Sequence, residues 1–298
     1  MGSRLFEKYE SVRRLYNEAD RLLGFPLSEL CFSGPPGELT NTINVQPAIL
    51  LTTMVCYEAA MEVAANRLPT PVFMAGHSVG EYTALVASKS LGFKDALRLT
   101  RERGRLMHEA GEQNPGGMIA ILGAEVSVVK ELCAESGMEI SNINAPGQVV
   151  ISGIMSDMVR AREIAANKGI RRIVPLNVSG PFHSRWMRPA SEVLKEQIIR
   201  TIFEKPEVPV ISNVNSNPLT NTTQIIDELI EQVIRPVQWQ RSIENMIAAG
   251  VNTFIEIGHG QVIAGLIKRI NEEVKIFNIG DLDTEAQLQS LLDYVYNT

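Results

Sequence analysis

The sequence predicts an α/β protein in which a small second domain is inserted into a larger one. The chain has 298 residues, about twice the ~150 residues of a typical domain. Residues 71–76 form a short apolar run, typical of a central parallel strand, that leads into a glycine-containing turn and a helical pattern. Between residues 116 and 178 the elements become shorter and follow the order βαββαβ. We therefore expect a larger α/β domain over 1–115 and 180–298 and a smaller domain over 116–179.

The first 115 residues should supply helices that pack around one buried strand. Apolar residues recur at three- and four-residue spacing from Leu5 to Leu22, and Gly24 ends the pattern. The next long segment is apolar on nearly every side, which indicates a buried helix. In order, we expect an amphipathic helix over 5–22, a buried helix over 47–67, a strand over 71–76, and helices starting at Glu81 and spanning 95–112.

The inserted segment alternates short strands with two helices, and Ser156 is placed to cap the second helix. Its order is that of the split βαβ, or ferredoxin-like, arrangement. The expected strands span 117–123, 138–144, 148–154 and 171–178, and the expected helices span 126–135 and 156–168. The larger domain should then resume with strands over 208–213 and 253–257 and helices over 223–233 and 240–249.

The composition excludes several classes of protein. With 45% hydrophobic and 21% charged residues, the chain is globular rather than disordered. A net charge of -6 argues against a nucleic-acid partner, because such binding depends on basic surface. No apolar run is expected to approach the roughly 18 residues of a membrane span, so we expect no membrane partner and a cytoplasmic location. The cysteines Cys31, Cys56 and Cys133 include no C-x-x-C pair, so they should be core residues.

Residues 76–80, Gly-His-Ser-Val-Gly, fit the pattern G-x-S-x-G. In that motif a sharp strand-to-helix turn pushes the serine hydroxyl out at the top of a sheet. The context here is suitable, because a strand pattern precedes the motif and a helix pattern follows it. Ser78 is therefore the candidate nucleophile, and the Val79 N–H should face the reacting carbonyl; a plain glycine-rich turn is the alternative.

A serine nucleophile needs a base, and the chain has four histidines. His77 adjoins Ser78, so its side chain should be directed away from the hydroxyl, and His108 falls on a polar helix face. His183 and His259 both follow strand-like runs at loop positions, where catalytic groups gather. From the residues alone, His183 and His259 are about equally good candidates for the base. For either one, the alternative role is a loop histidine bonded to a backbone carbonyl.

Arg103 lies inside the apolar stripe of the helix over 95–112, between Leu99 and Leu106. An arginine that points into a protein needs an anionic partner, because a buried unpaired charge costs several kcal/mol. Its planar fork suits a carboxylate held by two hydrogen bonds. Arg103 is therefore a candidate carboxylate-binding group, and permanent pairing with an internal Glu or Asp is the alternative.

Seven segments in order together resemble the malonyl-CoA:acyl-carrier-protein transacylase family, which includes the acyltransferase domains of polyketide synthases. The resemblance covers nearly the whole chain. The segments are Gln-Pro-Ala at 46–48, Gly-His-Ser-Val-Gly-Glu-Tyr at 76–82, Arg-Glu-Arg-Gly at 101–104, Asn-Ile-Asn-Ala-Pro-Gly-Gln-Val-Val-Ile-Ser-Gly at 142–153, Ser-Gly-Pro-Phe-His-Ser at 179–184, Pro-Val-Gln-Trp at 236–239, and 256–266, which begins Glu-Ile-Gly.

The resemblance implies a hydrolase-like parallel-sheet domain with the ferredoxin-like insertion, and a two-step acyl transfer. His183 would activate Ser78, malonyl-CoA would acylate it, and the pantetheine thiol of acyl carrier protein would remove the malonyl group. Arg103 would grip the malonyl carboxylate and Gln238 would orient the histidine. No cofactor or metal is implied. The residues implied to line the substrate pocket are His77, Val79, Asn142, Asn144 and Phe182, the last of which should crowd an α-methyl branch.

The chain departs from the family pattern at its start. Members open with an apolar strand and a P-G-Q-G-S-Q loop, whose glutamine gives the oxyanion hole a second backbone N–H. This chain opens with Met1-Gly2-Ser3, so we expect that strand and donor to be missing, at a cost of about 10²- to 10³-fold in rate. A catalytically impaired, truncated member is therefore one alternative. An acyl hydrolase is the other, although it would have no use for a carboxylate clamp.

Acyl carrier proteins are acidic, as is this chain, so a local basic patch should be needed for docking. Two clusters are candidates. They are Lys168, Arg171 and Arg172 at the end of the inserted domain, and Arg185 and Arg188 just beyond His183.

Overall fold

The structure, a computed structural model, describes residues 1–65, 67–281 and 283–297. Its α-helices are α1 (Ser3–Lys8), α2 (Glu10–Leu23), α3 (Leu27–Ser33), α4 (Pro36–Thr40), α5 (Thr42–Ala64), α6 (Gly80–Ala87), α7 (Phe93–Gln113), α8 (Val126–Ser136), α9 (Met155–Asn167), α10 (Arg188–Arg200), α11 (Thr222–Gln232), α12 (Trp239–Ala248), α13 (Val262–Ile270) and α14 (Thr284–Asn297). Its strands are β1 (Gly116–Leu122), β2 (Glu139–Ala145), β3 (Gln148–Ile154), β4 (Arg172–Pro175), β5 (Val210–Ile211), β6 (Pro218–Leu219), β7 (Thr253–Ile257) and β8 (Lys275–Ile279).

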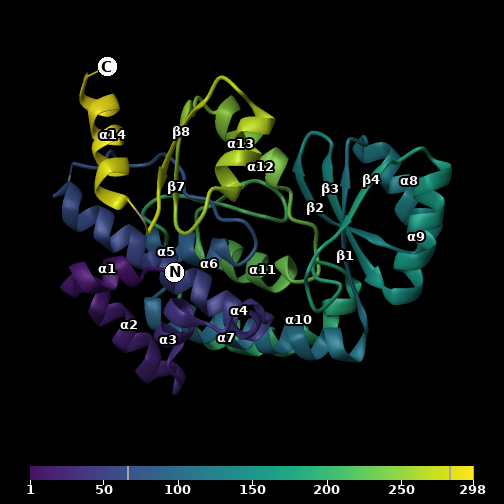
Figure 1. The fold of residues 1–298 in the computed structure, drawn as a ribbon, viewed down its shortest axis with the longest axis horizontal. Coiled ribbons are helices and arrows are strands. Elements are labelled where there is room, and N and C mark those ends of the chain that lie inside the picture. Colours follow the sequence, from purple (N-terminus) through teal and green to yellow (C-terminus); the bar gives the residue numbers. More distant parts are fainter. Residues whose placement is uncertain (66, 282, 298) are drawn as a thin grey trace.

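The antiparallel sheet of the inserted segment lies at one end of the long axis, with α8 and α9 on its outer face (Figure 1). Its strand order β2-β3-β1-β4 is that of the predicted ferredoxin-like arrangement. Ile119 and Ile121 of β1 pack with the two helices, while Met118 and Ala120 belong to the core of the larger part. Both faces of this sheet are therefore buried, one against α8 and α9 and the other against the larger part of the molecule.

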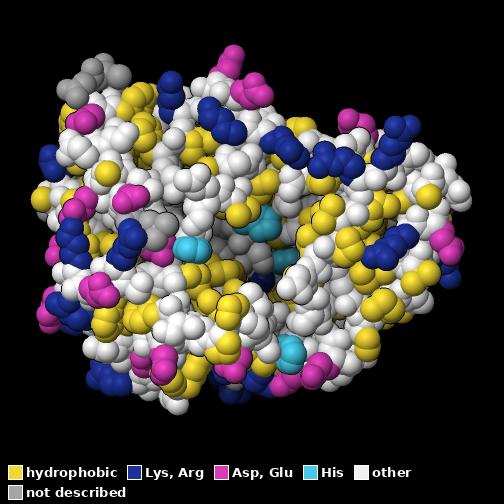
Figure 2. Space-filling model, viewed as in Figure 1, with side chains coloured by type: hydrophobic (Ala, Val, Ile, Leu, Met, Phe, Trp, Pro, Cys, Tyr) yellow, Lys and Arg dark blue, Asp and Glu magenta, His cyan; other side chains and the backbone are white. Residues whose placement is uncertain are grey.

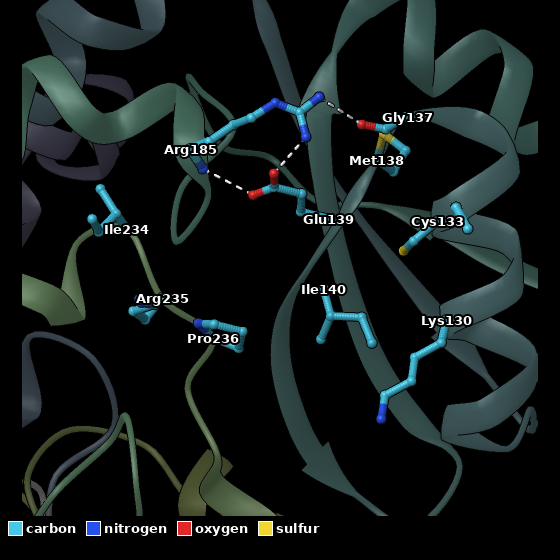
Figure 3. A pocket seen from close by; sticks show the side chains of 11 residues that line it. Lys130, Cys133, Gly137, Met138, Glu139, Ile140, Arg185, Ile234, Arg235 and Pro236 are labelled. Carbon is cyan, nitrogen blue, oxygen red and sulfur yellow. Dashed lines mark hydrogen bonds and ion pairs between the residues drawn. The ribbon is translucent and has the colours of Figure 1, made fainter.

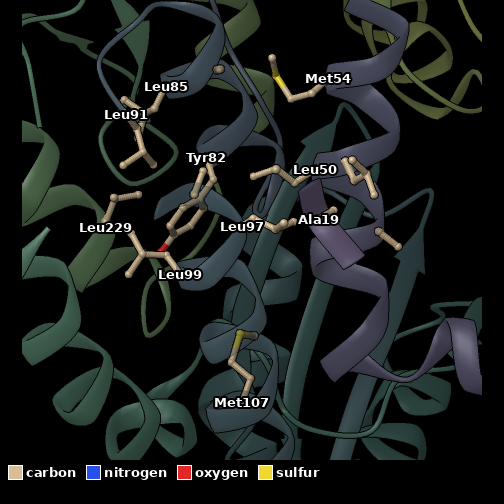
Figure 4. Close-up of a cluster of buried hydrophobic side chains, with 14 of the residues drawn as sticks. Ala19, Leu50, Met54, Tyr82, Leu85, Leu91, Leu97, Leu99, Met107 and Leu229 are labelled. Atoms are coloured by element: carbon tan, nitrogen blue, oxygen red, sulfur yellow. The ribbon is translucent and has the colours of Figure 1, made fainter. Parts of the chain in front are cut away.

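The core of the larger part forms around α5, which packs against α7. Gly104 of α7 allows the close approach, because a Cβ there would lie 2.5 Å from the Thr42 carbonyl oxygen. Leu50 of α5, Leu97 of α7 and Tyr82 of α6 lie in one buried cluster beside this crossing (Figure 4). By length and composition α5 could cross a membrane, contrary to our expectation that no run comes close. Most of it is buried, as in the core helix of a folded domain.

Several predicted elements are wrong in detail. The strand predicted over 208–213 is reduced to β5, Val210–Ile211. The amphipathic helix over 5–22 is two helices, because Tyr9 is extended at φ −111° and ψ 127° between α1 and α2. Ser156 does not cap α9; the helix begins one residue before it, and Ile154 at the N-cap makes no side-chain bond. β4 ends at Pro175, short of the predicted 178, although the Leu176 N–H still donates to the Met118 carbonyl oxygen at 2.9 Å.

The apolar run over 71–76 is shorter as a strand than predicted. It pairs only at Met74, in a parallel bridge with Val210. The Met74 N–H donates to the Pro209 carbonyl oxygen at 3.0 Å, and the Ile211 N–H donates to the Met74 carbonyl oxygen at 2.8 Å. The parallel direction agrees with the sequence prediction, as does the parallel pairing of β7 with β8. The pairing ends early because the chain turns at Gly76 toward α6.

Candidate active site

Ser78 occupies a strained turn between the Met74 bridge and α6. Its φ is +53°, in the left-handed region that residues other than glycine rarely adopt. Gly76 is required here, because a Cβ at this position would lie 2.0 Å from the Gly80 carbonyl group. The Glu81 N–H donates to the Ser78 carbonyl oxygen at 3.0 Å and so leads the turn into the helix. The G-x-S-x-G segment thus forms a sharp elbow with the serine at its apex.

His183 is placed to act as the base for this serine. Ser78 Oγ lies 2.8 Å from His183 Nε2, and His183 Nδ1 lies 2.8 Å from the Gln232 carbonyl oxygen. The carbonyl can only accept, so Nδ1 carries the proton and Nε2 is left to accept from the hydroxyl. Burial, together with the nearby Arg103 charge, lowers the pKa of His183 to about 3, which keeps the ring neutral.

The carbonyl that orients His183 belongs to Gln232, and the expectation that Gln238 would do this is wrong. Gln238 lies at the start of α12, where its N–H donates to the Asn213 carbonyl oxygen at 2.7 Å. Its own carbonyl oxygen accepts from Ser216 and Ser242. Gln232 is the last residue of α11, where helix carbonyls have no partner within the helix. The predicted end of this helix was the only sequence signal for its role.

Arg103 is 1% exposed and lies beside Ser78. Its Nη2 is 3.1 Å from Ser78 Oγ and 2.9 Å from Gln232 Oε1, and its Nη1 is 2.5 Å from Gln46 Oε1. These hydrogen-bond partners are neutral, so the alternative of permanent pairing with an internal carboxylate is wrong. Within the described part of the chain, the buried Nε–H has no partner. The site therefore holds a desolvated guanidinium that an incoming carboxylate can pair with.

The other pocket residues expected from the sequence make different contacts. His77 turns away from Ser78, places its Nε2 2.8 Å from Asn144 Oδ1 and packs against Trp239. Asn142 Oδ1 instead accepts from the neighbouring Ser141 hydroxyl at 2.8 Å. Phe182 is buried directly before His183.

The Val79 N–H stands at the first turn of α6, and no acceptor for it occurs among residues 1–65, 67–281 and 283–297. Backbone donors at a helix start are suited to stabilise an oxyanion.

His259, the rival base, lies away from this centre. Its Nδ1 is 2.9 Å from Asp281 Oδ1, on the loop after β7. Figure 2 shows a hollow in the middle of one face of the molecule, with histidine side chains on its wall. The structure therefore brings Ser78, His183 and Arg103 together and leaves His259 and Gln238 outside.

Comparisons with known proteins agree with this geometry. The model of the acyl transferase domain family matches residues 1–290. The malonyl CoA-acyl carrier protein transacylase of Bacillus subtilis is 44% identical over 98% of this chain and 92% of its own length. The Escherichia coli K12 enzyme of that name is 39% identical over 88% of this chain and 85% of its own length.

Solved structures give the same result. The acyl-carrier-protein S-malonyltransferase of Bartonella henselae superposes with a TM-score of 0.93 at 36% identity, over 99% of this chain and 94% of that one. A malonyl-transacylase bound to a type II polyketide-synthase acyl carrier protein also has a TM-score of 0.93, at 34% identity over the same shares. The chain therefore belongs to the acyl transferase domain family and, within it, to the malonyl-CoA:acyl-carrier-protein transacylases.

Proposed function

We propose that this protein transfers a malonyl group from malonyl-CoA to the pantetheine thiol of acyl carrier protein, through an acyl-enzyme on Ser78. One observation carries the proposal: Ser78 Oγ lies within hydrogen-bond distance of both the neutral His183 and the buried Arg103. The names of the relatives supply the two substrates, malonyl-CoA and acyl carrier protein. The sequence predicts that the enzyme works in the cytoplasm without a cofactor.

The two half-reactions use the same proton path. In the first, His183 Nε2 takes the Ser78 proton while Oγ attacks the thioester carbonyl, and the oxyanion faces the Val79 N–H. The intermediate then expels the coenzyme A thiolate, which takes the proton from His183. In the second, His183 takes the proton of the carrier thiol, and the thiolate attacks the malonyl ester. Ser78 leaves as the alkoxide and recovers its proton from His183.

Arg103 would select for the malonyl group. The free carboxylate of a malonyl thioester lies one carbon from the reacting carbonyl, so its binding group must lie beside the nucleophile. Arg103 does so, with Nη2 3.1 Å from Ser78 Oγ. Phe182, next to the base, would crowd an α-methyl branch on the same carbon.

Mixing the chain with malonyl-CoA should produce an acyl-enzyme that is stable until holo acyl carrier protein is added. Intact mass spectrometry follows both steps, as a gain of one malonyl group and then its loss together with malonylation of the carrier. A hydrolase would release malonate without carrier. An impaired member would form no adduct over the same time, so either result would contradict the proposal.

Arg103→Ala should lower the preference for malonyl-CoA over acetyl-CoA by about 10- to 150-fold. The lost charge-assisted pair is worth roughly 1.5–3 kcal/mol and exists only with the malonyl substrate. The ratio of the two kcat/KM values is the measurement, because it does not depend on the amount of folded enzyme. Arg105→Ala is a matched control, since Arg105 lies on the same helix and pairs with the exposed side of α7 through Glu102 and Glu109. An unchanged ratio in Arg103→Ala would make Arg103 a structural residue.

The structure favours one of the two candidate carrier-docking patches. Lys168 is paired with Glu131 and Glu135, at 3.1 and 2.8 Å. Arg171 and Arg172 beside it are exposed. Arg188 is also exposed, at the start of α10.

Arg185 is also paired, with Glu139, as Arg235 is with Glu231, but it lines a groove of about 590 Å³ next to the segment that carries His183. The groove runs between the small sheet and residues 234–236, and Arg185 reaches across it to Glu139 and the Gly137 carbonyl (Figure 3). Lys130 and Arg235 also line it. We therefore place carrier docking at this groove, because it combines cations with closeness to the base.

Reversing Lys130 and Arg235 to Glu should slow malonyl transfer to carrier protein about 10-fold and weaken its salt dependence, because these exposed charges would attract an acidic carrier. Acylation by malonyl-CoA should stay within about twofold of wild type. Stopped-flow measurement of each half-reaction separates the two effects. A reversal of Lys168, Arg171 and Arg172 is the comparison. If that reversal alone slows carrier transfer, docking lies at the far end of the small domain instead.

A further inference from the structure

Two side chains hold the left-handed backbone of Ser78 from outside the elbow. Gln232 Nε2 donates to the Ser78 carbonyl oxygen at 3.1 Å, and Asn213 bonds the chain on both sides of His77. Asn213 Oδ1 accepts from the Ser78 N–H at 2.7 Å, and Asn213 Nδ2 donates to the Gly76 carbonyl oxygen at 2.8 Å. The two bonds fall on either side of His77, so the amide spans the turn. Since φ +53° is unfavourable for serine, this conformation persists only where surrounding contacts impose it.

The register of the neighbouring strand shows what this amide replaces. Met74 pairs in parallel with Val210 and accepts a hydrogen bond from the Ile211 N–H. Two residues further along such a ladder, the Asn213 backbone N–H would donate to the Gly76 carbonyl oxygen. That carbonyl instead receives the Asn213 side chain. The side chain thus takes the place of the ladder bond and adds an acceptor for the next free donor, the Ser78 N–H.

Asn213 is itself held in place at both of its backbone groups. Its N–H donates to Glu81 Oε1 at 3.1 Å, and its carbonyl oxygen accepts from the Gln238 N–H at 2.7 Å. Glu81 is fully buried one helical turn after Ser78, and its other carboxyl oxygen accepts from the Gln232 side chain. Asn213 is 2% exposed. Its amide therefore has little freedom to leave the elbow.

We propose that Asn213 is a positioning residue for acyl transfer. Its side-chain amide, set in place by Glu81, continues the strand ladder through the elbow and holds Ser78 so that Oγ meets His183 and the Val79 N–H faces the substrate. The inference rests on the proposed function only in taking Ser78 as the nucleophile. It predicts that loss of the amide slows attack by Ser78 on any electrophile, whether or not that electrophile carries a carboxylate.

The test uses Asn213→Ala and Asn213→Asp, with Asn215→Ala as the matched control. The aspartate has nearly the same shape and keeps the acceptor for Ser78, but as a carboxylate it has no donor for Gly76. Asn215 lies in the same loop, is exposed and accepts from the Asn217 N–H through its side chain at 2.9 Å. Each variant is reacted with phenylmethylsulfonyl fluoride and with malonyl-CoA, and its thermal unfolding is recorded. The sulfonyl fluoride reports on Ser78 even if malonyl-CoA is not the substrate.

We expect both Asn213 variants to react about 10²-fold more slowly with both reagents, because a small misplacement of a nucleophile has an effect of this size. KM for malonyl-CoA should stay within about twofold, since Arg103 is untouched, and Asn215→Ala should match wild type. If Asn213→Ala does not fold, Asn213→Asp decides the question. A folded Asn213→Asp that reacts at the wild-type rate, or a loss confined to KM, would overturn the proposal. Wild type that reacts with the sulfonyl fluoride but not with malonyl-CoA would overturn the proposed function alone.

Discussion

Replacing Ser78 by alanine should abolish malonylation of the enzyme. The hydroxyl lies 2.8 Å from Nε2 of the neutral His183 ring, and no acyl-enzyme can form without it. Loss of a nucleophile of this kind lowers the rate by about 10⁶-fold, leaving only what binding and oxyanion contacts provide. Incubation with malonyl-CoA followed by intact mass spectrometry should show the unmodified mass.

Ser184→Ala is the control for this experiment. Ser184 adjoins His183 in sequence, but its hydroxyl is occupied by the Pro181 carbonyl oxygen at 2.5 Å. This variant should form the adduct as wild type does. A malonyl group that persists on Ser78→Ala, in a peptide that lacks residue 78, would refute the mechanism.

Replacing His183 by alanine should slow acylation of Ser78 by about 10⁴- to 10⁶-fold, because no other base in the described part of the chain reaches the hydroxyl proton. Single-turnover measurement with malonyl-CoA gives the rate. His259→Ala serves as the control, since this histidine is engaged with Asp281 and should leave the rate unchanged. A large loss in His259→Ala with little loss in His183→Ala would reverse the assignment of the base.

The pH dependence of acylation should reflect the lowered pKa of His183. The active form is the neutral ring, and burial and the Arg103 charge bring the pKa to about 3. The wild-type rate should therefore be flat from pH 8 down to about 5, and an inflection near 6.5 would contradict this environment. As pH is lowered, the free energy of unfolding should begin to fall at a higher pH than the acylation rate does. The unfolded chain binds a proton near pH 6.5 and the folded one does not, so the free energy of unfolding falls as pH drops from about 6.5 toward 3.

The fold class was predictable because its signals are local. The order of strands and helices in the inserted segment follows from the alternation of apolar runs, and the strand order found agrees with it. The elbow was predictable for the same reason, since Gly76 and Ser78 lie in one short motif. Arg103 could be recognised because a charged residue interrupts an apolar helix face, although the sequence did not show that neutral amides would surround it.

The parts that could not be predicted depend on contacts between distant segments. The base remained undecided between His183 and His259 until the resemblance favoured one, because spacing along the chain does not show which loop reaches Ser78. Gln232 and Asn213 act through a backbone carbonyl and through an amide that replaces a ladder bond. Neither residue type is diagnostic of catalysis. The wrong choice of Gln238 has the same cause, since a motif match indicates a segment and not the atom that makes the bond.

Gln232 supports the base and the arginine by two chemically independent routes. Its backbone carbonyl oxygen accepts from His183, while its side chain accepts from Arg103 and donates to Glu81 and to the Ser78 carbonyl oxygen. A backbone carbonyl is present whatever residue occupies the position, so a substitution there changes the surroundings of Arg103 and leaves the bond to the base available. A single substitution at this position would therefore alter acyl preference and loosen the Ser78 elbow together, while the proton path through His183 stays intact.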